Sequence, residues 1–519
     1  MNQLNKLRLD IDDNKHDNQT CHNCVSALNN AKLVIKSADL MKSTANTVCK
    51  TVVDETDRVC VGTLTSMAEP IVYILQNSAI TVPEMCGVLL HPDCMTHTGN
   101  EISHVVNWVL PLPHPKPFNP LQSVMSLTSK MLHLTDIHPD LYYTPGSNAR
   151  CSEPMCCRST SYGHNQSAGY WSDMSALCDA PCTFVSQTMR HIATAHRDLE
   201  FVIWSGDNVP HDAWNTSRQH NLDHIKAMTT MVKEELGDKR IFPGVGNHEP
   251  HPFNMYVPLE AALMSEGNHS MGWLYDTLAD NYWSQWIDTP EAKRSFKKGG
   301  YYSIQYTPGL KIIVLNNNVC IKRNYWLAYQ PVDPDDQLQW LIGQLDSAET
   351  DGSYAMLIKR YRNVITSTYH GHTHFDEIQV LYNKNISTGQ LYPVSHGYIG
   401  SSLSTFNHDA AVNPGYKIFT LNSNGKPLDI DIYYTNITAD NIAGQHVSPV
   451  WRSDESVKRM YGLQSLTTDS WHQFLMRAQT DDTIIGHYFN HFHRYSDPFV
   501  MDLKRKVMSV FSSEVELAN

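Results

Sequence analysis

The sequence predicts an α+β multi-domain protein, because successive regions of the chain show different patterns. Residues 17–98 combine clustered cysteines with helical periodicity and predict a small all-α domain. The dense prolines of residues 99–126 predict a stiff linker. Residues 127–445 carry apolar strands that alternate with helical stretches, which indicates a layered α/β sandwich. Residues 446–519 return to helical spacing and predict a C-terminal helical subdomain.

Cysteines close the predicted N-terminal domain. Half of the 12 cysteines of the chain lie between residues 21 and 94: Cys21, Cys24, Cys49, Cys60, Cys86 and Cys94. Disulfides in a helical domain of this size would stabilise a core that hydrophobicity alone leaves marginal. The spacing by itself leaves the pairing of these residues open.

The α/β domain is predicted from apolar runs that end in polar residues. These runs are residues 129–138, 199–208, 240–249 and 363–374. Helical stretches at residues 183–197 and 219–236 separate the first three runs. After residue 450 an apolar stripe at helical spacing contains Trp471, Phe474, Leu475, Ile484, Tyr488 and Phe492, and a second helical stretch follows Pro498. Such a stripe is typical of a packing surface, so these helices are expected to cover the α/β domain.

Composition and charge exclude some classes of function. The hydrophobic share of 41% and the charged share of 18% argue against a largely disordered chain. The formal net charge of −13 argues against a nucleic-acid partner. Protonation of all 27 histidines would change that charge from −13 to +14, so an acidic compartment would favour docking on anionic lipid. No apolar run predicts a membrane-spanning helix.

Glycosylation sequons are spread along the chain, at Asn18, Asn165, Asn215, Asn268, Asn385 and Asn436. Together with the clustered cysteines they indicate the secretory pathway. The first twenty residues, as written, contain no apolar segment of the kind that a signal peptide requires.

Metal-ligand residue types follow the predicted strands in a fixed order. They are Asp136, His138, Asp207, Asn247, His248, His372 and His374. In open α/β sheets functional groups gather where strands end, so we expect these side chains to lie close together. The ordered set resembles the calcineurin-like metallophosphoesterase family, in which such side chains hold two metal ions.

The resemblance implies a role for each residue of this set. Asp207 would bridge both ions, Asp136, His138 and His374 would complete the first site, and Asn247 and His372 would belong to the second. Two divalent ions about 3.5–4 Å apart can orient a phosphoryl group and stabilise both the attacking and the leaving oxygen. Imidazole-rich ligation suits zinc, with iron or manganese as alternatives.

Two further histidines are candidates for protonating a leaving alcohol. His248 lies beside Asn247, and His211 occurs in GDNVPHD. An imidazole has a suitable pKa for this role in an acidic compartment. The alternative for His211 is a surface loop without catalytic function.

A longer series of motifs narrows the resemblance. HLTDIHPDLYY, CCR, GYWSD, GDNVPHDAWNTSRQ, GNHEPHP, EGNHSMGWLYD, QLQWLIGQLDSAE, GHTHFDE and NPGYKI follow one another as they do in the acid sphingomyelinase family. Within this series, residues 17–98 resemble a domain of the saposin family. This resemblance implies zinc-dependent hydrolysis of sphingomyelin, in membranes or lipoproteins, to ceramide and phosphocholine. It also implies a saposin-like domain on anionic lipid, a monomer, and a lysosomal or secreted location.

The same resemblance implies the disulfide pairs. They would be Cys21 with Cys94, Cys24 with Cys86, Cys49 with Cys60, Cys151 with Cys156, and Cys157 with Cys178. Cys182 and Cys320 are left without family partners, as two free thiols or as a bond between them.

The sequence departs from the family in one segment. A strand and loop reading like Gly-His-Ile-Pro-Pro-Gly, which carries another second-site histidine, is missing before GHTH. The second site is therefore expected to hold its ion loosely, unless His370 reaches it along the same strand face as His372. The departure leaves two alternatives to a sphingomyelinase. One is a catalytically inactive lipid-binding protein, and the other is a phosphodiesterase that acts on nucleotides.

Overall fold

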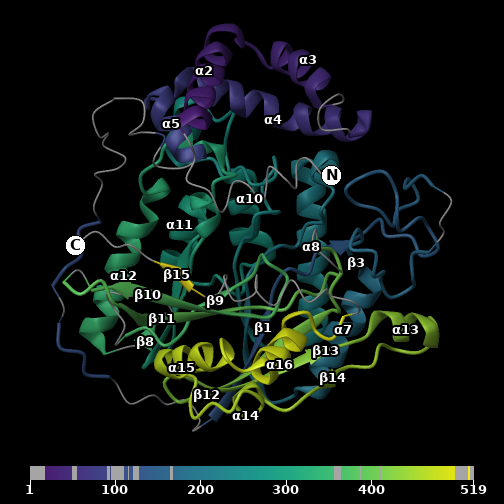
Figure 1. Ribbon diagram of the computed structural model, residues 1–519, viewed down its shortest axis with the longest axis vertical. Helices are drawn as coiled ribbons and strands as arrows, with labels where there is room; N and C mark the ends of the chain where they lie inside the picture. Colours follow the sequence, from purple (N-terminus) through teal and green to yellow (C-terminus); the bar gives the residue numbers. More distant parts are fainter. Residues whose placement is uncertain are drawn as a thin grey trace.

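The structure is a computed structural model. It describes residues 18–49, 55–90, 94, 110–114, 116–120, 128–163, 167–352, 354–355, 364–385, 387–407, 411–496 and 512–514. A helical unit near the N-terminus lies above a larger body that contains the sheets (Figure 1). The described parts of the expected linker, of the sequon at Asn165 and of the stretch after Pro498 are too short to test those predictions.

The described residues of the N-terminal unit form four helices, α2 (Asn18–Val34), α3 (Ala38–Val48), α4 (Asp57–Asn77) and α5 (Val82–Leu89). A side chain caps three of them: Ser37, Thr56 and Thr81 each accept a hydrogen bond from a backbone N–H of the first turn. Disulfides join Cys21 to Cys94, Cys24 to Cys86 and Cys49 to Cys60. These are the pairs that the saposin resemblance implies.

Helix α4 forms contacts between this unit and the α/β domain. By length and composition it is the one helix among the described residues that would be able to cross a membrane, whereas the sequence pattern predicted none. In the structure α4 instead packs on the α/β domain. Arg58 forms an ion pair with Glu153, and the backbone at Gly62 lies so close to the Trp214 carbonyl that a Cβ would clash. Gly62 therefore permits the close contact between the two units.

A six-stranded sheet forms the centre of the α/β domain, in the order β14-β13-β12-β1-β4-β5. Its strands are β1 (Thr128–Leu134), β4 (Leu199–Trp204), β5 (Arg240–Pro243), β12 (Gly415–Asn422), β13 (Pro427–Tyr434) and β14 (Arg452–Ser453). Strands β1, β4 and β5 are parallel, and helices α7 (Cys182–Ala195) and α8 (Arg218–Leu236) connect them as predicted. The carboxyl ends of these three strands therefore meet at one edge.

The remaining strands form smaller sheets. One has the order β15-β10-β11-β9, with β9 (Tyr369–His370), β10 (Glu377–Lys384), β11 (Leu391–Ile399) and β15 (Ser512–Glu514). Another has the order β6-β7-β8, with β6 (Tyr302–Thr307), β7 (Leu310–Val314) and β8 (Tyr354–Ala355). Strands β2 (Pro139–Asp140) and β3 (Ala180–Pro181) form a short pair. The side chains of Met131 and Phe419, from the central sheet, share one hydrophobic cluster with Val380 and Tyr398 of the second sheet.

The two strands on either side of the departure from the family in the sequence, β8 and β9, belong to different sheets. Strand β8 pairs with β7, whereas β9 pairs with β11. The strand expected over residues 363–374 is reduced to Tyr369 and His370 among the described residues. The described strands of these two sheets do not pair with one another.

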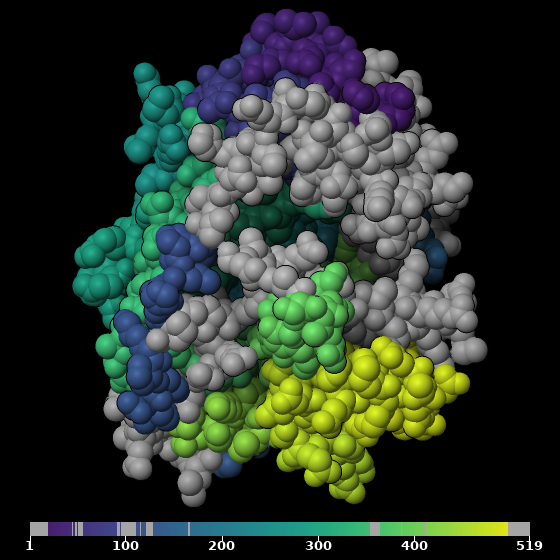
Figure 2. All heavy atoms as spheres, turned by 60° about the vertical axis from the view of Figure 1, so that its left-hand side comes forward, coloured from purple at the N-terminus to yellow at the C-terminus, as the bar shows by residue number. Residues whose placement is uncertain are grey.

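The C-terminal region is helical, as predicted, but not entirely. The helices are α14 (Val457–Met460), α15 (Thr468–Ala478) and α16 (Asp482–Phe492). The expected apolar stripe lies on α15 and α16 and is buried except at the half-buried Ile484, and α15 packs on β10 and β11. They form the yellow layer at the surface in Figure 2. Strands β14 and β15 correct the helical prediction, because these segments pair with sheet edges.

The other elements are α9 (Leu259–Met264), α10 (Gly272–Thr277), α11 (Pro290–Gly299), α12 (Gln337–Asp351), α13 (Ile437–Ala443), a π-helical turn (Leu278–Tyr282) and the short 3-10 helices η2 (Ala213–Asn215), η4 (Asn317–Cys320), η5 (Tyr325–Ala328) and η6 (Pro334–Asp336).

A buried carboxyl group at the start of β10 makes the stability of the fold depend on pH. The side chain of Glu377 is buried, its Oε2 has no hydrogen-bond partner, and burial raises its pKa from 4.5 to about 7. Between these two values the folded protein holds a proton that the unfolded chain releases. The free energy of unfolding therefore falls as the pH rises through this range.

Glu377→Gln is expected to remove this part of the pH dependence. The shift corresponds to about 3 kcal/mol of unfolding free energy between pH 4.5 and 7.5. Urea denaturation at both pH values measures it, with the exposed Glu234→Gln as a matched control. Equal pH dependence in the wild type and in Glu377→Gln would contradict the prediction.

Candidate metal centre and active site

The predicted ligands lie in tight turns at the strand ends. Residues following β1, β4 and β9 have backbone φ angles in the left-handed region: Asp136 at 48°, His138 at 43°, Asp207 at 58°, His372 at 85° and His374 at 67°. Non-glycine residues adopt this conformation at a cost of about 1–3 kcal/mol each, and it persists only where the surroundings impose it. The turns therefore hold side chains in positions that a relaxed loop would not keep.

A buried cluster of ligand atoms lies at this edge of the sheet. One ligand atom each from Asp136, His138 and Asp207 lie within 4.8 Å of one another, and the same holds for His138, His211 and His374. His374 Nε2 lies 3.6 Å from Asp136 Oδ1, which connects the two groups. The structure thus brings together all four residues that the resemblance assigns to the first metal site.

Hydrogen bonds orient the imidazoles toward the cluster. His138 Nδ1 donates to the Val209 carbonyl at 2.7 Å, and His374 Nδ1 donates to the Phe406 carbonyl at 2.7 Å. Each Nε2 is therefore left as the acceptor, which is the tautomer that a metal ligand requires. His138 Nε2 is buried and has no hydrogen-bond partner, so a cation at the centre of the cluster would satisfy it. A divalent ion fits these residues.

Negative charge at the centre also favours a cation. Burial and the nearby carboxylates of Glu249 and Asp136 raise the pKa of Asp207 well above its usual range. Glu249 holds two strand-end loops together, because it accepts from the backbone N–H groups of Asp207, Asn208 and Gly246 at 3.1, 2.6 and 2.6 Å. The sequence interpretation missed this role of Glu249. Its only signal is a charged residue directly after Asn247 and His248.

The residues implied for the second site form a smaller group. His372 Nδ1 lies 2.8 Å from Asn247 Oδ1, and the His372 N–H donates to Asp136 Oδ1 at 2.7 Å. His370 does not join them, because its ring lies against Gly397 and its carbonyl accepts from Gly400. Within the described ranges, neither group of metal-ligating carboxylates and imidazoles includes His370 or His372.

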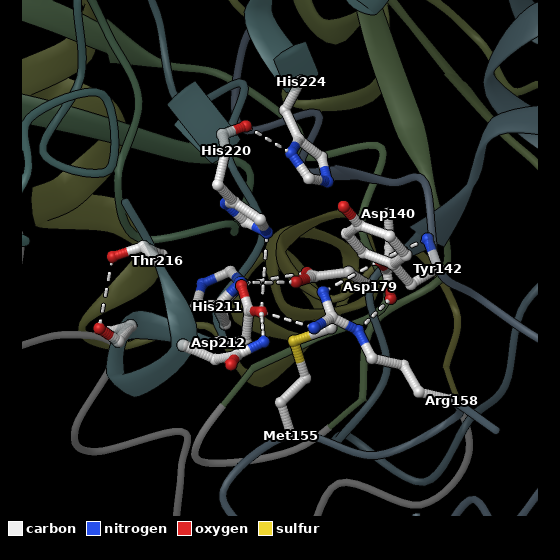
Figure 3. A network of polar contacts seen from close by, with 12 residues as sticks. Asp140, Tyr142, Met155, Arg158, Asp179, His211, Asp212, Thr216, His220 and His224 are labelled. Atoms are coloured by element: carbon white, nitrogen blue, oxygen red, sulfur yellow. Dashed lines mark hydrogen bonds and ion pairs between the residues drawn. The ribbon is translucent and has the colours of Figure 1, made fainter. Parts of the chain in front are cut away.

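His211 and His248 lie beside the first site. Their ring centroids are 4.4 Å apart, and they lie 4.1 and 4.8 Å from the ring of His138. Asp179, which the sequence interpretation did not include, accepts from the N–H of His211 at 2.7 Å and contacts His211 Nδ1 at 2.8 Å (Figure 3). The Phe406 ring stacks on His211 at 3.9 Å. His211 is therefore nearly buried, and Asp179 and Phe406 fix its ring, so it is not a surface loop histidine.

The surroundings of His211 and His248 favour different protonation states of the two rings. The Asp179 carboxylate would stabilise positive charge on the His211 ring, as a proton donor requires. For His248, burial and the charges of His211, His374 and His372 lower the pKa well below its usual range. This environment favours the neutral imidazole of His248, whose ring N–H can donate a hydrogen bond to a phosphoryl oxygen.

Arg158, in the CCR motif, anchors the loops that carry His138 and His211. Its guanidinium pairs with Asp140 at 2.8 Å and also with Asp212 (Figure 3). The two remaining disulfides, Cys151 to Cys156 and Cys157 to Cys178, flank this arginine and match the pairs implied by the resemblance. Cys182 and Cys320 are free thiols, so the alternative of a bond between them is wrong.

Comparisons with known proteins identify the family. Residues 129–376 match the family model described as calcineurin-like phosphoesterase. The chain is 30% identical to the sphingomyelin phosphodiesterase of Homo sapiens, over 90% of this chain and 74% of that protein. The chain belongs to the acid sphingomyelinase family. The sphingomyelin phosphodiesterase of Bos taurus is also 30% identical, over 85% of this chain and 72% of that protein. The cyclic GMP-AMP phosphodiesterase SMPDL3A of Homo sapiens is 25% identical, over 65% of this chain and 76% of that protein.

Membership of the acid sphingomyelinase family gives the site its chemistry, which is hydrolysis of a phosphodiester. A divalent ion held by Asp136, His138, Asp207 and His374 would act as a Lewis acid on the phosphoryl group. His248 can then donate to a phosphoryl oxygen, and His211 can protonate the leaving alcohol. Asp179 holds the His211 ring through its contact with Nδ1.

Proposed function

We propose that this protein hydrolyses sphingomyelin to ceramide and phosphocholine at acidic pH, with zinc as its metal. The observation that carries the proposal is the cluster of Asp136, His138, Asp207 and His374 with the two histidines beside it. Imidazole-rich ligation suits zinc. The similarity to the sphingomyelin phosphodiesterases over most of the chain supports the choice of substrate.

The N-terminal helices support a lipid substrate. Several apolar side chains of α2, α3 and α4 face solvent: Leu33 is 73% exposed, Val34 62%, Val61 50% and Leu40 40%. Exposed apolar groups on a disulfide-closed helical unit are suited to contact with a bilayer. We propose that this unit binds anionic lipid and brings the active site to membrane-bound sphingomyelin.

A lysosomal or secreted location agrees with the covalent structure. Five disulfides are stable in an oxidising compartment and rare in the cytosol. Asn215, Asn268 and Asn385 are exposed, as glycan acceptors must be, whereas Asn436 is half-buried and caps α13. Glycosylation at Asn18 and Asn165 concerns side chains outside the described part of the chain.

The two zinc sites are expected to differ in affinity. The first has two carboxylates and two imidazoles, whereas the second has Asn247, His372 and the shared Asp207. A divalent ion with three protein ligands needs each of them in good geometry. We therefore propose one firmly held zinc ion and a second that exchanges readily.

Two other functions rest on specific observations. The similarity to the cyclic GMP-AMP phosphodiesterase supports a nucleotide substrate, although that relative matches a smaller share of the chain. The absence of the Gly-His-Ile-Pro-Pro-Gly segment from the sequence before GHTH supports an inactive lipid-binding protein.

Release of phosphocholine from sphingomyelin liposomes at about pH 5 tests the proposal, near the titration range of histidine. We expect turnover that a zinc chelator abolishes and added zinc restores, with one zinc ion retained after dialysis. Cyclic GMP-AMP is offered in parallel. Hydrolysis of the dinucleotide alone would establish the nucleotide alternative, and liposome binding without turnover would establish the inactive lipid-binding protein.

A further inference from the structure

The residues directly after α16 turn back toward the metal ligands. Helix α16 ends at Phe492, and the chain then reverses through Arg494 and Tyr495, whose φ angles are 50° and 54°. This reversal directs the Arg494 side chain into the protein, where it is completely buried. A buried arginine is rare and requires partners for its charge and its N–H groups.

The partners of Arg494 belong to the turn that carries His374. Arg494 Nη2 donates to the His374 carbonyl at 3.0 Å, and Nη1 donates to Asp376 Oδ2 at 2.8 Å. Nε donates to the Asn413 carbonyl, and Nη2 also lies 3.4 Å from Ser402 Oγ. The planar guanidinium thus bridges a backbone and a side-chain oxygen of one turn.

Further contacts hold the same turn against α16. The N–H of Asp376 donates to the Phe492 carbonyl at 3.1 Å, and the rings of Phe375 and Phe492 stack with centroids 4.3 Å apart. Lys417 Nζ lies 3.0 Å from the other carboxylate oxygen of Asp376. Asp376 therefore carries a charge that two buried cations stabilise, and the turn has little freedom to move.

His374 is fixed at both ends by these interactions. The Phe406 carbonyl accepts from the ring Nδ1 of His374, and Arg494 donates to the His374 carbonyl. The φ angle of His374, 67°, is in the left-handed region. A strained conformation relaxes when the contacts that impose it are removed. The turn that presents His374 Nε2 to Asp136 is thus hydrogen-bonded to an arginine 120 residues further along the chain.

We propose that Arg494 is a positioning residue of the metal centre, which sets the affinity for the ion through His374 and Asp376. The inference rests on the proposed metal site and assigns a role in it to the C-terminal subdomain. Partners that orient a metal ligand typically change metal affinity by about 10–100-fold when they are replaced. A purely structural arginine would instead lower thermal stability and leave the affinity of the folded protein unchanged.

Competition with a chromophoric chelator measures zinc affinity in the full-length chain. Arg494→Met is expected to weaken binding by about 10–100-fold, and Arg494→Lys by less, because an ammonium can pair with Asp376 without reproducing the fork. Arg477 is the matched control, since it donates to the Tyr461 carbonyl at 2.9 Å within the same subdomain. Arg477→Met should bind zinc as the wild type does.

Thermal unfolding of the zinc-free proteins shows which variants are folded. If Arg494→Met does not fold, Asp376→Asn, which keeps the shape of the side chain, and Arg494→Lys carry the test, with weaker zinc binding expected in both. Wild-type zinc affinity in folded Arg494 and Asp376 variants would overturn this inference and leave the proposed function intact. Failure of the wild-type chain to bind zinc would overturn the proposed function as well.

Discussion

Asp207→Asn is expected to reduce turnover by about three orders of magnitude or more, because Lewis-acid stabilisation by a metal contributes several kcal/mol and each 1.4 kcal/mol is tenfold in rate. Asp207 is the carboxylate that both proposed sites share, and it belongs to the buried ligand cluster. Its carboxylate also accepts from the N–H of His248 at 2.8 Å, so the loss extends to the neighbouring loop.

Phosphocholine release and the zinc content of the purified variant measure this effect together. Asp223→Asn on α8 is the matched control, because Asp223 is exposed and accepts from Gln219. Near-normal turnover and zinc content in Asp207→Asn would show that the metal lies elsewhere.

The second large effect concerns the two histidines beside the metal ligands. His211→Ala is expected to slow sphingomyelin hydrolysis by about 10²–10⁴-fold, the usual contribution of a general acid. A p-nitrophenyl ester of phosphocholine should be hydrolysed almost normally, since its leaving group departs without a proton. His248→Ala should slow both substrates, because a donor to the phosphoryl oxygen acts whatever group leaves.

Zinc content and liposome binding are controls for this experiment, and both should stay at the wild-type level in the two variants. His472→Ala is the matched histidine variant, since His472 contacts the Tyr382 hydroxyl away from the cluster. Loss of zinc from His211→Ala would make His211 a ligand, an assignment that its distance from His138 and His374 also allows. Equal losses of activity on both substrates in His211→Ala would contradict the role of His211 as the general acid.

Much of the fold was predictable because local patterns encode it. Periodicity located α7 and α8 to within a residue or two, and the apolar runs located β1, β4 and β5. The short strand β9 was overestimated, because an apolar run does not reveal how few residues find a pairing partner. The same limit applies to β14 and β15, whose pairing depends on the edges of distant strands.

The candidate site divides in the same way. The sequence by itself determined which residues end the strands and in what order, so it identified Asp136, His138, Asp207 and His374 before their geometry was known. It also determined the cysteine spacing, from which the resemblance implies the disulfide pairs. These features are local, because a strand, its terminal turn and a motif each occupy a few consecutive residues.

Only the tertiary structure decided what holds these ligands. Glu249 joins the loops after β4 and β5, Asp179 orients His211, and Arg494 holds the turn of His374. Their partners lie 42, 32 and 120 residues away in the chain, and no local pattern specifies such contacts. The role of each residue follows from burial, because a buried carboxylate or guanidinium must find partners wherever the fold places them.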